Sequence, residues 1–276
     1  MRDICKIWYA ITSVVLASIL VTQASAQTDY EFFELFKQKS DDVIDELRKT
    51  NMPEWAGIYT RPYMNAVEKL YLAPETGYAF VFTTHIHRYS IDLGSISHDG
   101  DILRISTKLK AGERVRHIPN ILYPIKWGNR HYVVAESDML RFANYVNLGR
   151  EPSTLHVSTF FLLKDGDENK PVSGKPVLPA RFARLILDRP IKMKIIETSE
   201  VTTGASETGT EYKTVVRVDG GRNLGVWDGM TLIVPKDRNA GEIIITNVGE
   251  KSSTGYYKNN LSSDSPRRGT TVKSRY

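Results

Sequence analysis

Cysteine is nearly absent from this sequence. The only cysteine among its 276 residues is Cys5, close to the start. The rest of the chain therefore cannot form disulfides, use a thiol nucleophile or build a thiolate metal site. An exported chain without cysteine fits a bacterial periplasm better than a eukaryotic secretory route.

Long hydrophobic runs are also missing, with one exception near the start. Residues 7–21 are almost continuously apolar, two basic residues precede them, and the small residues Ala24-Ser25-Ala26 follow. This order predicts a signal peptide over residues 1–26, cleaved between Ala26 and Gln27. An uncleaved membrane anchor is the alternative, although a span takes about 20 residues. We therefore expect a periplasmic or secreted bacterial protein with no stable membrane span after cleavage.

The body of the chain lacks an excess of charge. The formal net charge is +5, and residues 251–276 hold six bases and one acid, so the end of the chain accounts for the whole excess. A nucleic-acid-binding domain has a basic face, so nucleic acid is not an expected partner. Residues 260–276 are poor in apolar side chains, which predicts a disordered basic tail.

The motifs of common hydrolases and calcium sites are absent or incomplete. No Gly-x-Ser-x-Gly elbow occurs. Ser97-His98-Asp99 are adjacent, so they cannot meet in the line that a catalytic triad needs. Asp165, Asp167 and Asn169 match half of a calcium loop, but Lys170 stands where that loop needs glycine. We predict no catalytic residue and no cofactor, and we favour a protein that is not an enzyme.

What the sequence does have is a strand-rich stretch near its end. Residues 214–218, 231–234, 241–248 and 252–257 are short runs with many β-branched and aromatic residues, which predicts strands. Glycine-containing turns separate them. Short strands at this spacing predict a small antiparallel β-barrel over residues 189–259.

The turns of this stretch carry a resemblance to a known family. Asn223-Leu224-Gly225-Val226, then Gly229-Met230, then the isoleucines at 243–245 follow a spacing similar to that of small SH3-like barrels in bacterial envelope proteins. The C-terminal domain of the flagellar assembly protein T family is one example. The resemblance implies an SH3-like fold and an envelope setting, and it brings no catalytic role with it.

Residues 27–188 are expected to form an N-terminal domain. Apolar residues share one stripe over residues 29–50, which predicts a helix that packs on the following sheet. Strand-like runs with hairpin turns follow, and they predict an antiparallel β-meander or half-open, lipocalin-like barrel. A second helix is expected at residues 135–147. The expected fold class is therefore mainly β with flanking helices (α+β).

Three short stretches of this domain resemble a group of secreted bacterial proteins. They are residues 72–77, 127–132 and 167–174. No activity is assigned to that group, so the resemblance supplies no site residue.

Two sets of residues are candidates for binding. His85 and His87 are two residues apart, so on a strand both imidazoles would face one metal ion, as in a metal-dependent hydrolase. Trp55, Tyr59 and Trp127 would line a pocket if the β domain were a small-ligand carrier. The simpler interpretations are solvent-facing histidines and a buried aromatic core.

The leading hypothesis is a non-enzymatic protein that presents a surface to an envelope protein or a cell-wall polymer. It rests on export, on the absence of catalytic motifs and on polar residues that are expected to be dispersed instead of gathered in a sheltered site. The sequence indicates neither the oligomeric state nor the particular partner.

Overall fold

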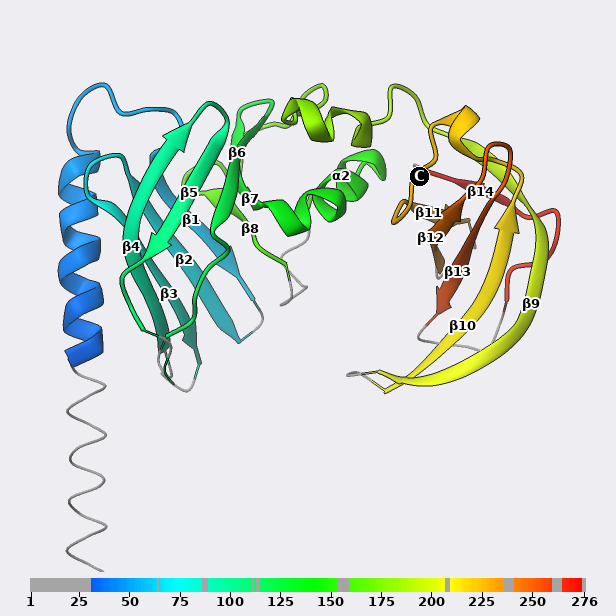
Figure 1. Ribbon diagram of the computed structural model, residues 1–276, viewed down its shortest axis with the longest axis horizontal. Coiled ribbons are helices and arrows are strands. Elements are labelled where there is room, and N and C mark those ends of the chain that lie inside the picture. Colours follow the sequence, from blue (N-terminus) through cyan, green and yellow to red (C-terminus); the bar gives the residue numbers. More distant parts are fainter. Residues whose placement is uncertain are drawn as a thin grey trace, which may run out of the picture. The chain divides into compact units, whose positions relative to one another are not determined.

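The computed structural model describes residues 31–274 except residues 64, 86–88, 111, 113–114, 153–158, 207–208, 236–240 and 260–264. The described part is mainly β, with two closed β-barrels and few helices (Figure 1), which confirms the predicted fold class. The predicted signal peptide and its cleavage point between Ala26 and Gln27 lie outside the described residues.

The first barrel has eight strands whose order in space is their order in the chain. They are β1 (Gly57–Pro62), β2 (Ala66–Ala73), β3 (Gly77–Thr84), β4 (Tyr89–Asp99), β5 (Ile102–Thr107), β6 (Ile121–Trp127), β7 (Arg130–Ala135) and β8 (Phe161–Lys164). Strand β8 closes the barrel by pairing antiparallel to β1, with Tyr59 opposite Lys164. The predicted meander is therefore a closed barrel.

A helix over residues 31–47 covers part of the outside of this barrel. Its Phe36 is buried with Ala79 and Ile91 on the outer face of β3 and β4, as the apolar stripe predicted. Near the end of the helix, Glu46 accepts hydrogen bonds from the backbone N–H groups of Glu75 (2.9 Å) and Thr76 (2.6 Å). These bonds fix the helix to the turn between β2 and β3.

The second barrel has six strands in the order β10-β13-β12-β11-β14-β9. Their bounds are β9 (Lys192–Ser206), β10 (Gly209–Val218), β11 (Thr231–Val234), β12 (Gly241–Val248), β13 (Ser253–Asn259) and β14 (Thr271–Lys273). Its core is apolar and includes Met193, Ile195, Leu232, Ile243 and Val272.

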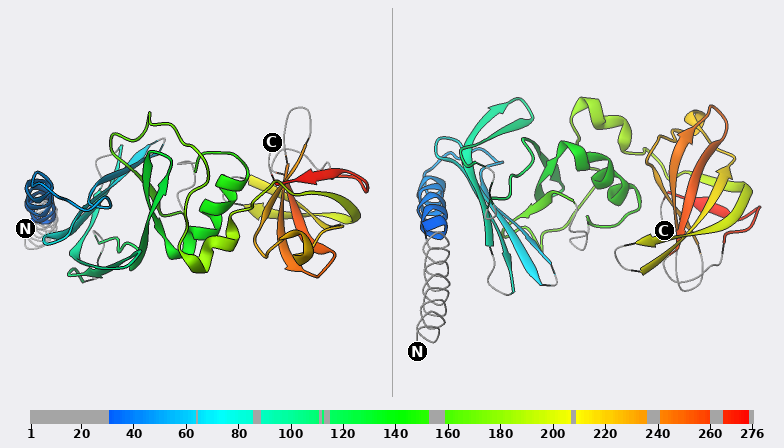
Figure 2. Two further views of the ribbon diagram at one scale, coloured as in Figure 1. Left: turned by 90° about the horizontal axis from the view of Figure 1, so that it is seen from above. Right: turned by 60° about the horizontal axis from the view of Figure 1, so that its bottom comes forward.

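Strand β14 corrects the prediction of a disordered tail at residues 260–276 for the part that the structure describes, residues 265–274. It pairs with both β9 and β11, so it completes the barrel; Figure 2 shows it in red. The side chain of Val272 is 0% exposed. The hydroxyl of Ser274 accepts a hydrogen bond from the backbone N–H of Ile191 at 2.9 Å. One apolar residue and two neighbouring strand edges are enough to order this segment.

The chain forms two compact units. The first comprises the described residues up to Pro124 together with Leu162–Glu168, and the second comprises Ile125–Phe161 and the described residues from Asn169 onward. The predicted second helix is present as η1 (Glu136–Asp138) followed by α2 (Met139–Asn147), and it belongs to the second unit. The boundary predicted at residues 188–189 stays a prediction.

Candidate functional site

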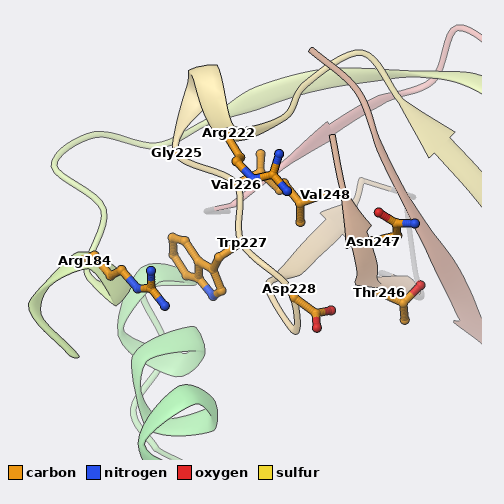
Figure 3. A pocket seen from close by; sticks show the side chains of 9 residues that line it. All are labelled: Arg184, Arg222, Gly225, Val226, Trp227, Asp228, Thr246, Asn247 and Val248. Atoms are coloured by element: carbon orange, nitrogen blue, oxygen red, sulfur yellow. The ribbon is translucent and has the colours of Figure 1, made fainter. Parts of the chain in front are cut away.

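Two adjoining pockets form a groove in the second unit, and Figure 3 shows the first of them. Their volumes are about 460 and 530 Å³, and both are lined by Arg184 and Gly225. One wall is the helical turn η2 (Ala180–Leu185) with the residues that follow it. The other wall is the corner after β10, where η3 (Arg222–Leu224) leads into residues 225–228. Pockets of this size suit a small molecule or a segment of a polymer.

Glycines shape the corner that forms the second wall. Gly225 has φ +78°, a left-handed conformation that favours glycine, and its N–H bonds to the carbonyl of Arg222 at 2.9 Å. A Cβ on Gly221 would collide with the carbonyls of Gly249 and Glu250. The backbone N–H of Arg222 donates to Gly249 O at 3.0 Å. The backbone of the corner is thus held against residues 249–250, and the Arg222 side chain is exposed.

Helix α2 braces both walls through two asparagines. Asn144 donates to Gly229 O at 2.9 Å and accepts from Thr231 N at 3.1 Å, next to the corner. One turn later, Asn147 donates to Leu185 O at 2.7 Å and accepts from Leu187 N at 2.9 Å. Each amide uses both its donor and its acceptor on backbone groups.

These bonds preorganise the groove. The same helix holds η2 on one side and the Gly229 corner on the other, so the spacing of the two walls does not depend on a ligand. Gly229 also approaches Leu140 closely, where a Cβ would collide with the leucine side chain.

The first pocket presents two guanidinium groups around an indole. Figure 3 shows Trp227 standing between the side chains of Arg184 and Arg222. Both arginines are exposed, and neither forms an ion pair with any residue that the structure describes. Guanidinium groups stay charged at any physiological pH and bind carboxylates or phosphates through two parallel hydrogen bonds. The pocket is therefore suited to an anion.

The indole N–H of Trp227 is an unsatisfied group buried behind this pocket. Its Nε1 atom is buried and has no hydrogen-bond acceptor within the described part of the chain. A buried donor without an acceptor costs about 1–3 kcal/mol. An ordered water enclosed beside the ring would remove that cost.

The second pocket adds more bases than acids. Arg189 and Lys192 line it and are exposed. Its one carboxylate, Asp188, lies 3.3 Å from Lys175. Asp228 contributes one further carboxylate to the first pocket. The groove as a whole therefore has an excess of positive charge.

The predicted pocket residues are in hydrophobic cores. Trp55 and Tyr59 are buried in the first unit, where the Tyr59 hydroxyl donates to Trp55 O at 2.8 Å. The ring of Trp55 lies 5.4 Å from that of His98. Trp127 is buried in the second unit and donates from Nε1 to Gly174 O at 3.1 Å. Trp55 and Tyr59 are thus in contact with each other, and a ligand role for the three residues stays a prediction.

The proposed histidine metal site falls partly outside the described residues. Strand β3 ends at Thr84, so His85 lies in the turn beyond it instead of on the strand as predicted. Its Nδ1 lies 3.3 Å from Asn65 O. His87 is outside the described residues. Among the residues that are described, no group of three or more His, Cys, Asp or Glu side chains is placed to hold a metal ion.

A cluster of ionisable residues inside the first barrel was not predicted. Arg61 and Glu68 face each other across β1 and β2, and their side chains are almost completely buried. The Arg61 Nε atom donates to Glu68 Oε2 at 2.9 Å, and Arg116 Nη2 lies 2.9 Å from Glu68 Oε1. The guanidinium of Arg116 also lies 4.4 Å above the ring of Phe82. The expectation of dispersed polar groups is therefore wrong for this barrel.

A second buried carboxylate ties a loop to the same interior. Asp92 on β4 accepts hydrogen bonds from the Thr107 hydroxyl (2.5 Å) and from the backbone N–H of Ile118 (3.0 Å). His117 Nδ1 lies 3.6 Å away from it. Burial raises the pKa of the neighbouring Tyr78 hydroxyl, and the Asp92 charge raises it further.

No family model matches the chain, and none of the curated proteins or solved structures matches it. The resemblance to SH3-like barrels of the flagellar assembly protein T family thus stays a prediction. None of the helices in the described ranges is long and apolar enough to cross a membrane.

The groove residues were missed because they lack a motif. A weak indication was present: Arg222 and Trp227 are large side chains in a glycine-rich corner that otherwise serves only to turn the chain. Arg184 comes from a separate segment, and nothing local indicates that it joins them.

Proposed function

We propose that this is an exported bacterial envelope protein, periplasmic or secreted, that acts without catalysis. Its second unit presents the groove to an envelope protein or a cell-wall polymer. The observation that carries the proposal is the pair of exposed arginines, Arg184 and Arg222, on either side of Trp227 without a counter-ion in the described chain. Export is supported by the apolar run at residues 7–21 and by Ala24-Ser25-Ala26. The turn pattern supports an SH3-like barrel as its fold.

The chemistry of the groove favours binding over catalysis. Its charged groups are guanidiniums, one ammonium and two carboxylates, and arginine neither gives up nor takes a proton near neutral pH. A rigid groove braced by Asn144 and Asn147 lowers the entropy cost of binding. These features suit recognition of a charged partner.

Cross-linking in living cells tests the proposal. A photoreactive amino acid replaces Leu224, which is exposed and lines the second pocket. The full-length protein is then compared with an Arg184→Glu/Arg222→Glu variant. We expect envelope adducts that the charge reversal abolishes.

The matched control is Arg217→Glu, which changes an exposed arginine already paired with Glu197 on the same barrel. We expect this variant to keep the adducts. If the reversal at Arg184 and Arg222 leaves the same adducts as wild type, the proposed role of the groove is wrong.

A small-ligand carrier is the second candidate. One observation favours it: the first barrel is closed and holds Glu68 between the guanidiniums of Arg61 and Arg116, and the Arg116 side chain is 37% exposed. Two guanidiniums share one carboxylate, so the cluster has one excess positive charge, which can pair with an anionic ligand headgroup. Native mass spectrometry of the purified protein would show a co-purified small molecule, lost in Arg116→Gln. A spectrum without one would count against the carrier.

A further inference from the structure

The cations of the groove follow its length instead of meeting at one point. Arg222 lines the first pocket, Arg189 and Lys192 line the second, and Arg184 lines both. A compact anion such as free phosphate would engage one chamber and leave the other cations unmatched. A chain with regularly spaced negative charges would engage both.

The remaining lining is suited to sugar rings. Trp227 and Leu224 provide apolar surface, which can lie against the C–H faces of a pyranose. Thr246 and Asn247 add a hydroxyl and an amide, which can both donate to and accept from sugar hydroxyls. Single-stranded nucleic acid is a poorer match, because its binding sites stack successive bases on several aromatic rings. Trp227 is the one aromatic residue among those that line the two pockets.

We infer that the groove binds an acidic polysaccharide, with carboxylates of the chain on Arg184 and Arg222 and a sugar ring against the Trp227 side chain. This inference rests on the proposed function, because it names the ligand class of the same groove. The carboxylate is placed to form paired hydrogen bonds with guanidinium groups.

The experiment is calorimetric titration of the whole exported protein with polygalacturonate. Dextran is the neutral polymer, while polyphosphate and polyglutamate carry charge without acidic sugar rings. We expect binding to polygalacturonate that weakens as salt rises through the physiological range, where the screening length is about 8 Å. Dextran is expected not to bind, and the other two polyanions are expected to bind at least about tenfold more weakly, because charge alone gives no ring contact or hydroxyl hydrogen bonds.

Three substitutions locate the site. Arg184→Gln and Arg222→Gln are each expected to weaken polygalacturonate binding about tenfold, as the loss of a charge-assisted hydrogen bond does. Trp227→Ala is expected to weaken it about tenfold, because the indole surface that lines the pocket is lost as a contact for the sugar ring. A purely structural role for Trp227 would instead lower stability and leave the affinity unchanged. Arg217→Gln removes the same charge from a paired arginine and is expected to bind as wild type does.

Failure of this inference can be told apart from failure of the proposed function. Absence of polygalacturonate binding, equal binding to polyglutamate or polyphosphate, or insensitivity to both arginine substitutions would overturn the acidic polysaccharide. If the cross-links at position 224 still disappear on charge reversal, the groove remains a binding surface for a different partner. If those cross-links also persist, both conclusions are wrong.

Discussion

The first barrel places ionisable groups in its interior, whereas the core of the second barrel is formed by apolar side chains. Glu68 and Arg61 are paired inside the first, with Arg116 completing the cluster. The second fills its core with residues such as Leu232, Ile243 and Val272 and leaves its arginines at the surface. A buried ion pair contributes little net stability but is costly to break. An exposed arginine contributes little to folding and stays available to a ligand.

The largest expected effect comes from breaking the buried cluster. Glu68→Ala leaves the guanidinium of Arg61 in the barrel interior without its carboxylate. We expect the free energy of unfolding of the first unit to fall by about 3–5 kcal/mol, because an uncompensated buried charge is strongly unfavourable. Scanning calorimetry measures this loss. A loss below about 1 kcal/mol would show that the cluster does not depend on Glu68.

A smaller effect is expected in the apolar core of the second barrel. Val272→Ala removes two methyl groups from a fully buried side chain in β14. The transfer and cavity terms together predict a loss of about 2 kcal/mol. Thr271→Ala, at the exposed neighbouring position, is the control and is expected to stay within about 0.5 kcal/mol of wild type. Equal effects of the two substitutions in chemical denaturation would mean that β14 is not part of the core.

The first unit is expected to lose stability at alkaline pH. Burial raises the pKa of Tyr59, Tyr63 and Tyr78, all in the first unit. Because the folded pKa lies above the unfolded value near 10, each hydroxyl stabilises the fold below pH 10, and this contribution is lost as the pH rises toward the folded pKa.

Tyr59 and Tyr78, which are fully buried, should therefore each cost the first unit on the order of 1 kcal/mol at pH 11, and the half-buried Tyr63 should cost less because water screens it. Tyr78→Phe should lessen this loss. Circular dichroism between pH 9 and 12, with tyrosine ionisation followed by absorbance, checks both expectations. A first unit whose stability does not change between pH 9 and 12 would contradict the assignment.

The smallest effect is expected at a surface ion pair of the second barrel. Arg217 and Glu197 lie 2.7 Å apart on neighbouring strands, with more than half of the glutamate side chain exposed. We expect Glu197→Gln to cost less than about 0.5 kcal/mol, since water already solvates both groups. A thermal melt as strongly shifted as that of Glu68→Ala would remove the contrast between the two barrels.

Sequence patterns predicted the elements whose periodicity is local. The helix with Phe36, the hairpin turns and the helix over residues 139–147 follow from the spacing of apolar residues and from turn glycines. The charged cluster does not, because Arg61 meets Glu68 only through the register of β1 with β2. Predicting it would require the position of the turn to within one residue, since a slip by one turns each side chain to the other face.

The groove and β14 depend on contacts between distant parts of the chain. Arg184 and Arg222 share a pocket because Asn144 and Asn147 of α2 fix both walls. In the sequence, Val272 is a single valine in a polar segment. It becomes part of the core only because its strand pairs with both β9 and β11. Such pairings leave no local trace in composition or periodicity.

The position of β14 has a consequence for the order of assembly. The second barrel closes only when residues 271–273 insert between β9 and β11, so both of those edges stay open while the chain is still emerging. Open strand edges are templates for pairing with other chains. If a protease removes this segment, or a fusion keeps it from inserting, β9 and β11 keep unpaired edges, and we expect the protein to associate through them.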